Sequence, residues 1–364
     1  MATIPLSEEI EDQDTRFRRA FDVLTQAIGR RTFPGAAVAI TLRGRLIALR
    51  GLGRFTYAPD STAVTADSIW DLASVTKVVA TTALCMVLYE NGDFKPETSV
   101  AEILPEFAHG DSRRKKITLR MLLAHSSGLP AYVKLFETAA TRDELLRQTL
   151  ATPLVADPGA HAEYSDIGFI LLGLAIERMM RQPLDVLCRE RIFAPLGLAT
   201  MTYQPPAAWK IRIPPTVEDL SVRHRIIQGE VHDENASVMG GVSGHAGCFS
   251  TAADVARFAE CMLRGGAPLV KPETVEIFTR REELPPGTSH ALGWDTPSQP
   301  SQSGRYFSAR SFGHLGYTGT SLWIDPERQL SVTLLTNRTW PDRASQEIKQ
   351  VRPAFHDAVG EGLQ

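Results

Sequence analysis

The 364-residue sequence has only four cysteines, and no two of them form a C-x-x-C pair. So few, widely separated cysteines exclude the dense disulfide framework of a small secreted domain. Isolated cysteines are usually buried thiols, and we expect this of Cys85, Cys188, Cys248 and Cys261. A chain of this length buries about three quarters of its unfolded surface, so its core needs neither disulfides nor metal ions.

An excess of either charge is also lacking. Lys and Arg number 39 against 42 Asp and Glu, which gives a net charge of -3. This balance provides no sequence-wide electrostatic footprint for nucleic acid or for an anionic membrane, and we expect neither partner. Hydrophobic residues make up 43% and charged residues 22%, a composition that is typical of globular proteins and excludes a disordered or fibrous chain.

No apolar run reaches the roughly 20 residues that a transmembrane helix needs, and the best candidate, 167–176, is too short. The first twelve residues are acidic and lack the positively charged and apolar regions of a signal peptide. We therefore expect a cytoplasmic protein without a membrane span. A periplasmic or secreted protein whose signal peptide has been removed would leave the same sequence. The oligomeric state is not predicted.

Several enzyme signatures are missing. The sequence contains no G-x-x-x-x-G-K-[ST] phosphate loop, no G-x-G-x-x-G after a strand, no H-E-x-x-H and no G-x-S-x-G elbow. Residues 232–234, His-Asp-Glu, resemble a metal cluster. Adjacent side chains of an extended segment point in alternate directions, so we interpret these residues as a polar loop. We expect no metal and no cofactor.

The order of predicted elements indicates an α+β protein. Strand-like segments occur near both chain ends, and a helix-rich block separates them. We predict one antiparallel sheet flanked by helices, built from residues 1–70 and 286–364, and a helical lobe, 71–285, with the active site between them. The elements behind this prediction are a helix at 8–30, a hairpin at 36–49, helices at 74–90, 165–182 and 252–264, strands at 305–312, 319–325 and 330–336, and a helix at 342–358.

Residues 74–77, Ser-Val-Thr-Lys, are the first candidate catalytic motif. On a helix, residues i and i+3 share a face, so the Ser74 hydroxyl would lie beside the Lys77 amine. An activated serine nucleophile needs such a neighbour, and the helix N-terminus adds free N–H groups for an oxyanion. The alternative is a helix-capping serine with a peripheral lysine. A second match, 112–115, lies in a charged run and is interpreted as a solvated loop.

Three further segments strengthen this interpretation: 122–130, 163–169 and 312–321. Together with residues 74–77 they resemble the serine β-lactamase and penicillin-binding protein family, specifically its class C β-lactamase branch. That branch also holds D-alanyl-D-alanine peptidases and β-lactamase-like esterases. The three motifs of the family correspond here to Ser74-Val-Thr-Lys77, Tyr164-Ser-Asp166 and His314-Leu-Gly316, and a glycine-rich segment corresponds to 240–254. The resemblance spans about residues 15 to 340.

The resemblance implies a β-lactamase/transpeptidase-like fold and two-step acyl transfer through an acyl-enzyme. Ser74 would attack a carbonyl carbon, and Lys77 would help to remove its proton. Tyr164, as a phenolate or a hydrogen-bond relay, would act as base and then as acid for the leaving group. The backbone N–H groups of Ser74 and Tyr317 would form the oxyanion hole.

This sequence departs from the family pattern at two motifs. Asp166 replaces the usual Asn, and a carboxylate near Lys77 would favour the charged ammonium and shift the base role toward Tyr164. Alternatively, Asp166 only caps the following helix. In the third motif, K-T-G becomes His314-Leu315-Gly316. His is cationic only part of the time near neutral pH and Leu has no hydroxyl, so recognition of a substrate carboxylate is weakened.

The candidate substrate-binding residues are His125, Asp166, His314, Leu315 and Gly316. The main hypothesis is a serine hydrolase that acts on small carboxylic esters, with weak β-lactamase activity as a side reaction. A class C-like β-lactamase or a D-alanyl-D-alanine carboxypeptidase is the alternative within the family, and a transacylase is compatible with the same residues. An inactive binding or sensor scaffold is the alternative from another class. The expected partner is a small acyl substrate, an ester, amide or β-lactam.

Overall fold

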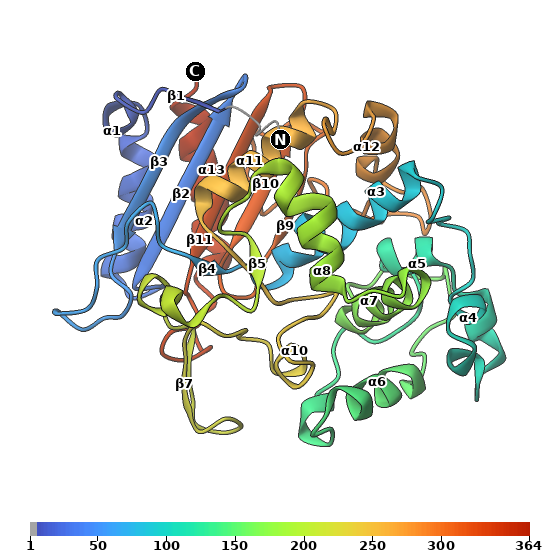
Figure 1. The fold of residues 1–364 in the computed structure, drawn as a ribbon. Helices are drawn as coiled ribbons and strands as arrows, with labels where there is room; N and C mark the ends of the chain where they lie inside the picture. Colours follow the sequence, from blue (N-terminus) through green and yellow to red (C-terminus); the bar gives the residue numbers. More distant parts are fainter. Residues whose placement is uncertain (1–5) are drawn as a thin grey trace.

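A computed structural model describes residues 6–364 (Figure 1). Its main sheet has six strands in the order β1-β3-β2-β11-β10-β9, and both chain ends contribute to it. All neighbouring pairs are antiparallel except β1 with β3, which is parallel. The predicted α+β fold is confirmed. The strands are β1 (Ser7–Glu8), β2 (Gly35–Leu42), β3 (Arg45–Gly53), β9 (Phe312–Leu315), β10 (Ser321–Asp325) and β11 (Leu330–Thr336).

Helices cover both faces of this sheet. α2 (Arg18–Gly29) and α13 (Ile348–Glu361) pack together on one face, and α11 (Ala252–Leu263) lies on the other, against β2 and β11. The central strands are therefore buried on both sides, which explains why β2 consists almost entirely of small and branched apolar residues and why β11 contains only leucine, valine, serine and threonine. α11 was predicted as part of the helical lobe 71–285, but its apolar face packs on the sheet.

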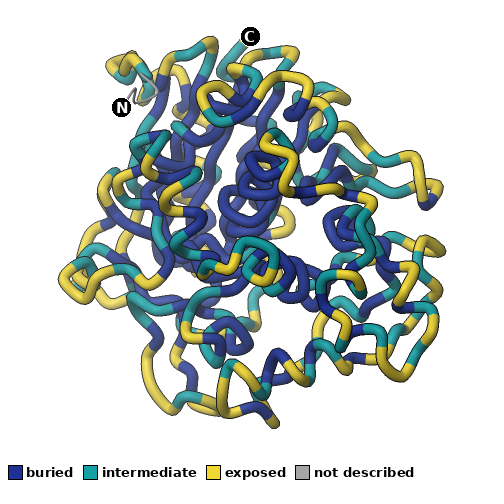
Figure 2. The backbone as a smooth tube through the Cα atoms, turned by 45° about the vertical axis from the view of Figure 1, so that its right-hand side comes forward, coloured by how far each residue is buried: buried dark blue, intermediate teal, exposed yellow. Residues whose placement is uncertain are grey.

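The remaining helices lie mainly beside the sheet, and Figure 2 shows the buried backbone concentrated in the sheet and the helices next to it. They are α3 (Ala83–Glu90), α4 (Val100–Ile103), α5 (Leu119–Leu123), α6 (Arg142–Ala151), α7 (Asp166–Met180), α8 (Leu184–Cys188), α9 (Ala194–Leu196), α10 (Glu234–Val238) and α12 (Pro272–Thr279). Short strands form two small sheets, β4 (Trp70–Asp71), β8 (Cys248–Ser250) and β5 (Thr202–Tyr203), and β6 (Val217–Asp219) with β7 (Arg225–Ile227).

A central helical stretch carries the first motif. It starts as a 3-10 turn at Ala73–Val75, continues as a π-helix over Lys77–Thr82 and ends as α3. Residues Ala73–Glu90 are long and apolar enough to cross a membrane by composition alone, but 83% of them are buried inside the fold. The apolar composition of this stretch therefore belongs to the protein core.

Some predicted boundaries were wrong. Residues 305–311 form a loop, and β9 begins only at Phe312, because Asp325 accepts hydrogen bonds from the backbone N–H and the hydroxyl of Ser308 and holds this loop outside the sheet. The first helical region begins at Gln13 and is divided at Phe17 into α1 (Gln13–Arg16) and α2. The last helix begins at Ile348, after a turn in which Asp342 accepts from the N–H of Ala344.

Candidate active site

The turn before Ser74 is held in an unusual backbone conformation. Ala73 has a φ of 46°, in the left-handed region that a residue with a Cβ rarely adopts. The Asp71 carboxylate stabilises this turn, because it accepts hydrogen bonds from the N–H of Ala73 at 2.8 Å and from the N–H of His232 at 2.6 Å. The turn places Ser74 at the start of the buried helical stretch, as the sequence predicted.

Four predicted residues meet in one hydrogen-bonded cluster. Lys77 Nζ lies 3.0 Å from Ser74 Oγ, 2.6 Å from Tyr164 Oη and 2.6 Å from Asp166 Oδ1. Tyr164 Oη lies 2.7 Å from Ser74 Oγ and 2.9 Å from Asp166 Oδ1. Lys77 is fully buried and also donates to the carbonyl oxygen of His245 at 3.0 Å. The first two motifs, 90 residues apart, thus form a nucleophile surrounded by groups that can take its proton.

Burial determines the protonation of this cluster. Loss of hydration lowers the pKa of Lys77, and the Asp166 carboxylate opposes this shift. Loss of hydration and the Asp166 charge both raise the pKa of Tyr164 well above 10. A resting phenolate is therefore disfavoured, and Tyr164 is a neutral phenol that accepts a hydrogen bond from Lys77 and donates its own proton to Ser74 or Asp166.

The structure also decides the role of Asp166 in the second motif. Helix α7 begins at Asp166, but its N-cap is Ser165, whose hydroxyl accepts from the N–H of Gly168 at 3.1 Å. The Asp166 carboxylate instead contacts Lys77 and Tyr164. The alternative in which Asp166 serves only as the helix cap is wrong, because the adjacent serine fills that position.

The third motif lies at the end of edge strand β9, directly against the turn that carries Ser74. The Thr318 hydroxyl donates to the Asp71 carbonyl and the Thr320 hydroxyl to the Leu72 carbonyl, both at 2.9 Å. A Cβ on Gly316 would lie only 2.6 Å from the Leu72 oxygen, so this contact requires glycine.

The two backbone donors expected in the oxyanion hole belong to the turn that carries Ser74 and to the turn after β9 that carries Tyr317. Within residues 6–364, the N–H groups of Ser74 and Tyr317 donate no hydrogen bond to another group. Both residues line the same cavity. The arrangement can therefore offer two N–H groups to an oxyanion, and their role as an oxyanion hole stays a prediction.

The sequence predicted a partial positive charge on His314, but the structure indicates a neutral ring. Its Nδ1 lies 2.8 Å from the Leu315 carbonyl oxygen, which can only accept, so Nδ1 carries the proton and Nε2 is an acceptor in the neutral ring. Burial lowers the pKa of His314 to about 3, and the nearby Lys77 charge contributes to this shift. His314 is therefore neutral at physiological pH, so the third motif itself provides no cation.

Ser74 opens into a cavity of about 630 Å³. Tyr164, Asp166, His314, Leu315, Gly316 and Tyr317 line it, as predicted, and the ring of Tyr317 is half exposed at its edge. Sequence analysis missed other polar residues in the lining. They are Tyr132, His232, Asp233, Glu234, His245, His290, Asp295, Arg338, Arg343, Gln346, Lys349 and Arg352. Residues 232–234 were interpreted as a polar loop, and the acid–histidine pattern was the only available signal.

His125 was expected to bind substrate, but it lies behind the cavity and not in its lining. Its ring packs against the rings of Tyr164, with centroids 4.9 Å apart, and Phe169, at 5.1 Å. Its Nδ1 accepts from the N–H of Ser165 at 3.0 Å. His125 thus positions the second motif, and the expected contact with substrate is corrected to a supporting role.

The remaining candidates for chemistry are possible metal ligands and the four cysteine thiols. Among residues 6–364, no group of three His, Cys, Asp or Glu side chains is placed to hold a metal ion. All four cysteines are buried free thiols, as predicted. Burial raises the pKa of Cys248, next to the glycine-rich segment, so this thiol is not an activated nucleophile.

Comparisons with known proteins agree with this geometry. The family model named Beta-lactamase matches residues 17–354. A protein of Escherichia coli K12 named "Putative D-alanyl-D-alanine carboxypeptidase" is 34% identical over 305 residues, 75% of this chain and 70% of the relative. A Bacillus subtilis protein named N-acetylmuramyl-L-alanine amidase is 33% identical over 343 residues, 84% of this chain and 77% of the relative.

Solved structures share the fold at lower identity. EstCE1, described as a hydrolase with promiscuous acyltransferase activity, superimposes with a TM-score of 0.77 at 21% identity, over 95% of this chain and 99% of EstCE1. Simvastatin synthase (LovD) from Aspergillus terreus gives 0.76 at 22% identity, over 96% of this chain and 99% of that protein. At these identities the similarity shows a common fold.

Proposed function

Because the chain belongs to the β-lactamase family and is a serine acyl-transfer hydrolase of that fold, we propose that its substrates are small carboxylic esters that carry no free carboxylate. One observation supports this choice. At the third motif, His314 is neutral and Leu315 has no hydroxyl, so neither side chain can replace the Lys-Thr pair that the family resemblance associates with a substrate carboxylate. An ester without a free carboxylate, with an alcohol as its leaving group, needs no such pair.

The first half-reaction starts at the Ser74 hydroxyl. Ser74 Oγ attacks the ester carbonyl carbon and passes its proton to Tyr164 Oη, while the phenolic proton moves to Asp166 Oδ1, 2.9 Å away. Lys77 donates to Ser74 Oγ and Tyr164 Oη, and stabilises the negative charge that develops on both atoms. The relay then runs backwards and delivers the proton to the departing alkoxide. This step leaves an acyl-Ser74 ester.

Water completes the cycle by the same relay. It attacks the acyl carbon and gives a proton to Tyr164, and Ser74 Oγ leaves and recovers that proton. In both halves the carbonyl oxygen becomes negative, and the free N–H groups of Ser74 and Tyr317 are the donors available to it. Removal of one such donor typically costs about 2.7–4 kcal/mol of the activation barrier.

The test compares wild type with Ser74→Ala on p-nitrophenyl acetate and butyrate. We expect turnover that depends on Ser74, and an intact-mass increase equal to the acyl group when the reaction is quenched early. Equal hydrolysis by the wild type and the alanine variant, with no adduct, would contradict the proposal.

A second candidate substrate class is an amide that ends in a free carboxylate. Arg352 lines the cavity, is 5% exposed and donates to the carbonyl oxygens of Gly316 at 2.6 Å and Thr320 at 2.9 Å. Among the described residues it has no acidic partner, and its Nε is buried without an acceptor. α13 thus brings a cation to the third motif, where the sequence showed none.

The name of the Escherichia coli relative makes a D-alanyl-D-alanine peptide the natural probe for this candidate. Wild type is assayed on N-acetyl-D-alanyl-D-alanine and on the same peptide with a C-terminal amide. Faster release of D-alanine from the free acid would favour the carboxypeptidase, whereas equal rates would exclude recognition of a carboxylate by Arg352.

A further inference from the structure

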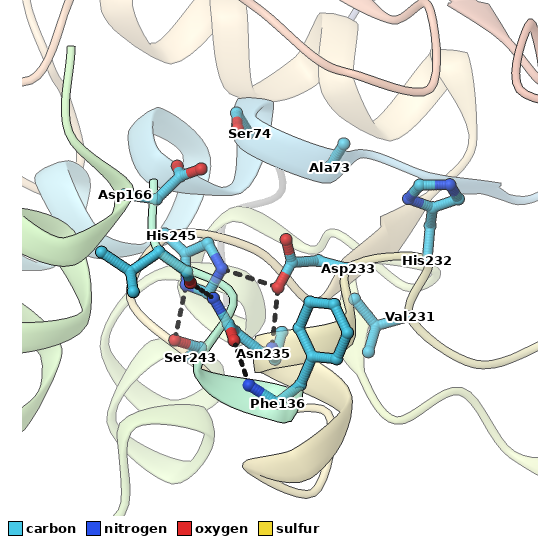
Figure 3. A network of polar contacts seen from close by, with 12 residues as sticks. Ala73, Ser74, Phe136, Asp166, Val231, His232, Asp233, Asn235, Ser243 and His245 are labelled. Carbon is cyan, nitrogen blue, oxygen red and sulfur yellow. Dashed lines mark hydrogen bonds and ion pairs between the residues drawn. The ribbon is translucent and has the colours of Figure 1, made fainter. Parts of the chain in front are cut away.

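One carboxylate in the cavity takes no part in the reaction described above. Asp233 immediately precedes α10, and its Oδ1 accepts from the N–H of Ala236 at 2.7 Å and lies 2.9 Å from His245 Nε2 (Figure 3). Its other oxygen, Oδ2, has no hydrogen-bond partner within residues 6–364. Figure 3 shows this oxygen directed away from His245, toward the segment that carries Ala73 and Ser74.

The surroundings hold this carboxylate in place. His245 is buried, and its Nδ1 lies 2.8 Å from the Ser243 hydroxyl, so both ring nitrogens are engaged. Asn235, two residues after Asp233, accepts from the N–H of Phe136 at 3.0 Å and donates to the Val133 carbonyl at 2.9 Å (Figure 3). The free Oδ2 is therefore oriented before any ligand binds, which reduces the entropy lost on binding.

Asp233 is ionised, and among residues 6–364 it has no lysine or arginine partner. Burial alone would raise its pKa, but His245 and the N–H of Ala236 outweigh that effect and hold the pKa below its ordinary value. The side chain is 21% exposed, and its one ion-pair partner among the described residues is His245. No lysine or arginine of the described chain pairs with it. An anion in such a site attracts a cation more strongly than it would in water.

The other carboxylates of the cavity already have partners. Glu234 pairs with Arg343 at 2.5 Å, and Asp166 pairs with Lys77 at 2.6 Å. Asp295 accepts from Ser289 and Thr296, and burial raises its pKa, so its charge is disfavoured. Asp233 is thus the cavity carboxylate, among residues 6–364, that is ionised, pairs with no lysine or arginine and keeps one oxygen without a hydrogen bond.

We propose that Oδ2 of Asp233 binds an ammonium group of the substrate, so that the enzyme prefers esters and amides of amino acids with a free amino group. An ammonium group supplies N–H donors and the opposite charge, which together match the free oxygen. This inference rests on the proposed acyl transfer at Ser74, because Asp233 and Ser74 line the same cavity. The preferred acyl group would thus carry a positive charge, which Asp233 recognises and the third motif does not.

The experiment uses alanine methyl ester and N-acetylalanine methyl ester, each as both enantiomers. We expect wild type to favour the free amine by at least about tenfold in kcat/KM, the effect of a charged hydrogen bond. Asp233→Asn keeps the shape of the side chain and the acceptor for His245 but removes the charge. The ratio of kcat/KM for the free amine to kcat/KM for the N-acetyl ester should therefore fall close to one. Glu234→Gln, which alters a carboxylate already paired with Arg343, is the matched control and should keep the wild-type ratio.

The pH profile separates charge recognition from a structural role of Asp233. An α-amino group loses its proton at about pH 8. The wild-type preference should therefore decline above that pH, whereas the ratio for Asp233→Asn should stay flat. A preference that persists in Asp233→Asn, or that is absent in wild type, would overturn the inference.

Binding provides a readout that does not require turnover. In the Ser74→Ala background, calorimetry should show that alaninamide binds at least about tenfold more tightly than N-acetylalaninamide, and that Asp233→Asn abolishes the difference. Absence of this difference overturns the ammonium site even when the esters are hydrolysed. Absence of Ser74-dependent ester turnover, with the binding difference intact, contradicts the proposed esterase and supports the site.

Discussion

Lys77 Nζ lies 2.6 Å from Asp166 Oδ1, and the lysine is completely buried. The family pattern has an Asn at the position of Asp166, so here a carboxylate replaces a neutral amide. Its charge opposes the loss of the Lys77 proton and raises the pKa of Tyr164. Burial and this charge together disfavour a resting phenolate at Tyr164.

The first prediction concerns this relay. Tyr164→Phe should lower the single-turnover acylation rate on a p-nitrophenyl ester by about 10²–10⁴-fold, the usual contribution of a positioned acid–base group. This loss should be at least as large as that of Asp166→Asn, because the phenol hydrogen-bonds to Ser74 directly, whereas the Asp166 carboxylate reaches Ser74 only through Tyr164 and Lys77. Tyr132→Phe, which alters another phenol in the cavity, is the control. A nearly active Tyr164→Phe enzyme would refute the relay.

The second prediction is an acidic limb in the pH–rate profile. Burial raises the pKa of Asp71 to about 6, and the ionised form accepts from the N–H groups of Ala73 and His232. As the pH falls through about 6, protonation weakens both hydrogen bonds and loosens the turn before Ser74, so activity should fall. Above that pH the carboxylate is ionised and activity should level off.

Asp71→Asn tests the origin of this limb, because the amide cannot ionise. Its kcat/KM, measured from about pH 4.5 to about pH 8.5, should be low throughout and lack the transition near 6. If the variant keeps the wild-type acidic limb, another group is responsible for it.

The third prediction concerns the link between the two oxyanion donors. Thr320→Val leaves the Leu72 carbonyl without its hydroxyl donor, which should cost about 1–3 kcal/mol of unfolding free energy in denaturant melts. Because the turns that carry Ser74 and Tyr317 are then less well fixed, kcat should fall more than KM rises. Thr320→Ser, which restores the hydroxyl, should recover both quantities. Wild-type kcat in Thr320→Val would contradict this role.

The fourth prediction concerns selectivity at the third motif. Leu315 lines the cavity, and Leu315→Thr introduces the hydroxyl that the family uses beside a substrate carboxylate. Hydrolysis of a chromogenic cephalosporin should therefore improve relative to that of p-nitrophenyl acetate, and a charged hydrogen bond of this kind corresponds to about tenfold or more. An unchanged ratio of the two kcat/KM values would count against the hypothesis.

Short-range patterns in the sequence were sufficient for much of the fold. The hairpin of β2 and β3, helices α7 and α11, and strand β11 follow from local apolar segments bounded by turn or capping residues. Residues 305–311 deviate because a distant carboxylate, Asp325, holds them outside the sheet. Such a contact leaves no periodic signal in the segment itself.

The same division applies to the site. The sequence by itself determined that Ser74, Lys77, Tyr164 and Asp166 are candidates, since helical spacing and family motifs are local properties of the chain. Only the tertiary structure decided that His125 lies behind the cavity and that His314 is neutral. It also decided that Arg352 and Asp233 line the cavity and that, among residues 6–364, the first has no acidic partner and the second no lysine or arginine partner. These properties depend on burial and on neighbours far away in the chain, because hydration and charge pairing arise only when the chain is folded.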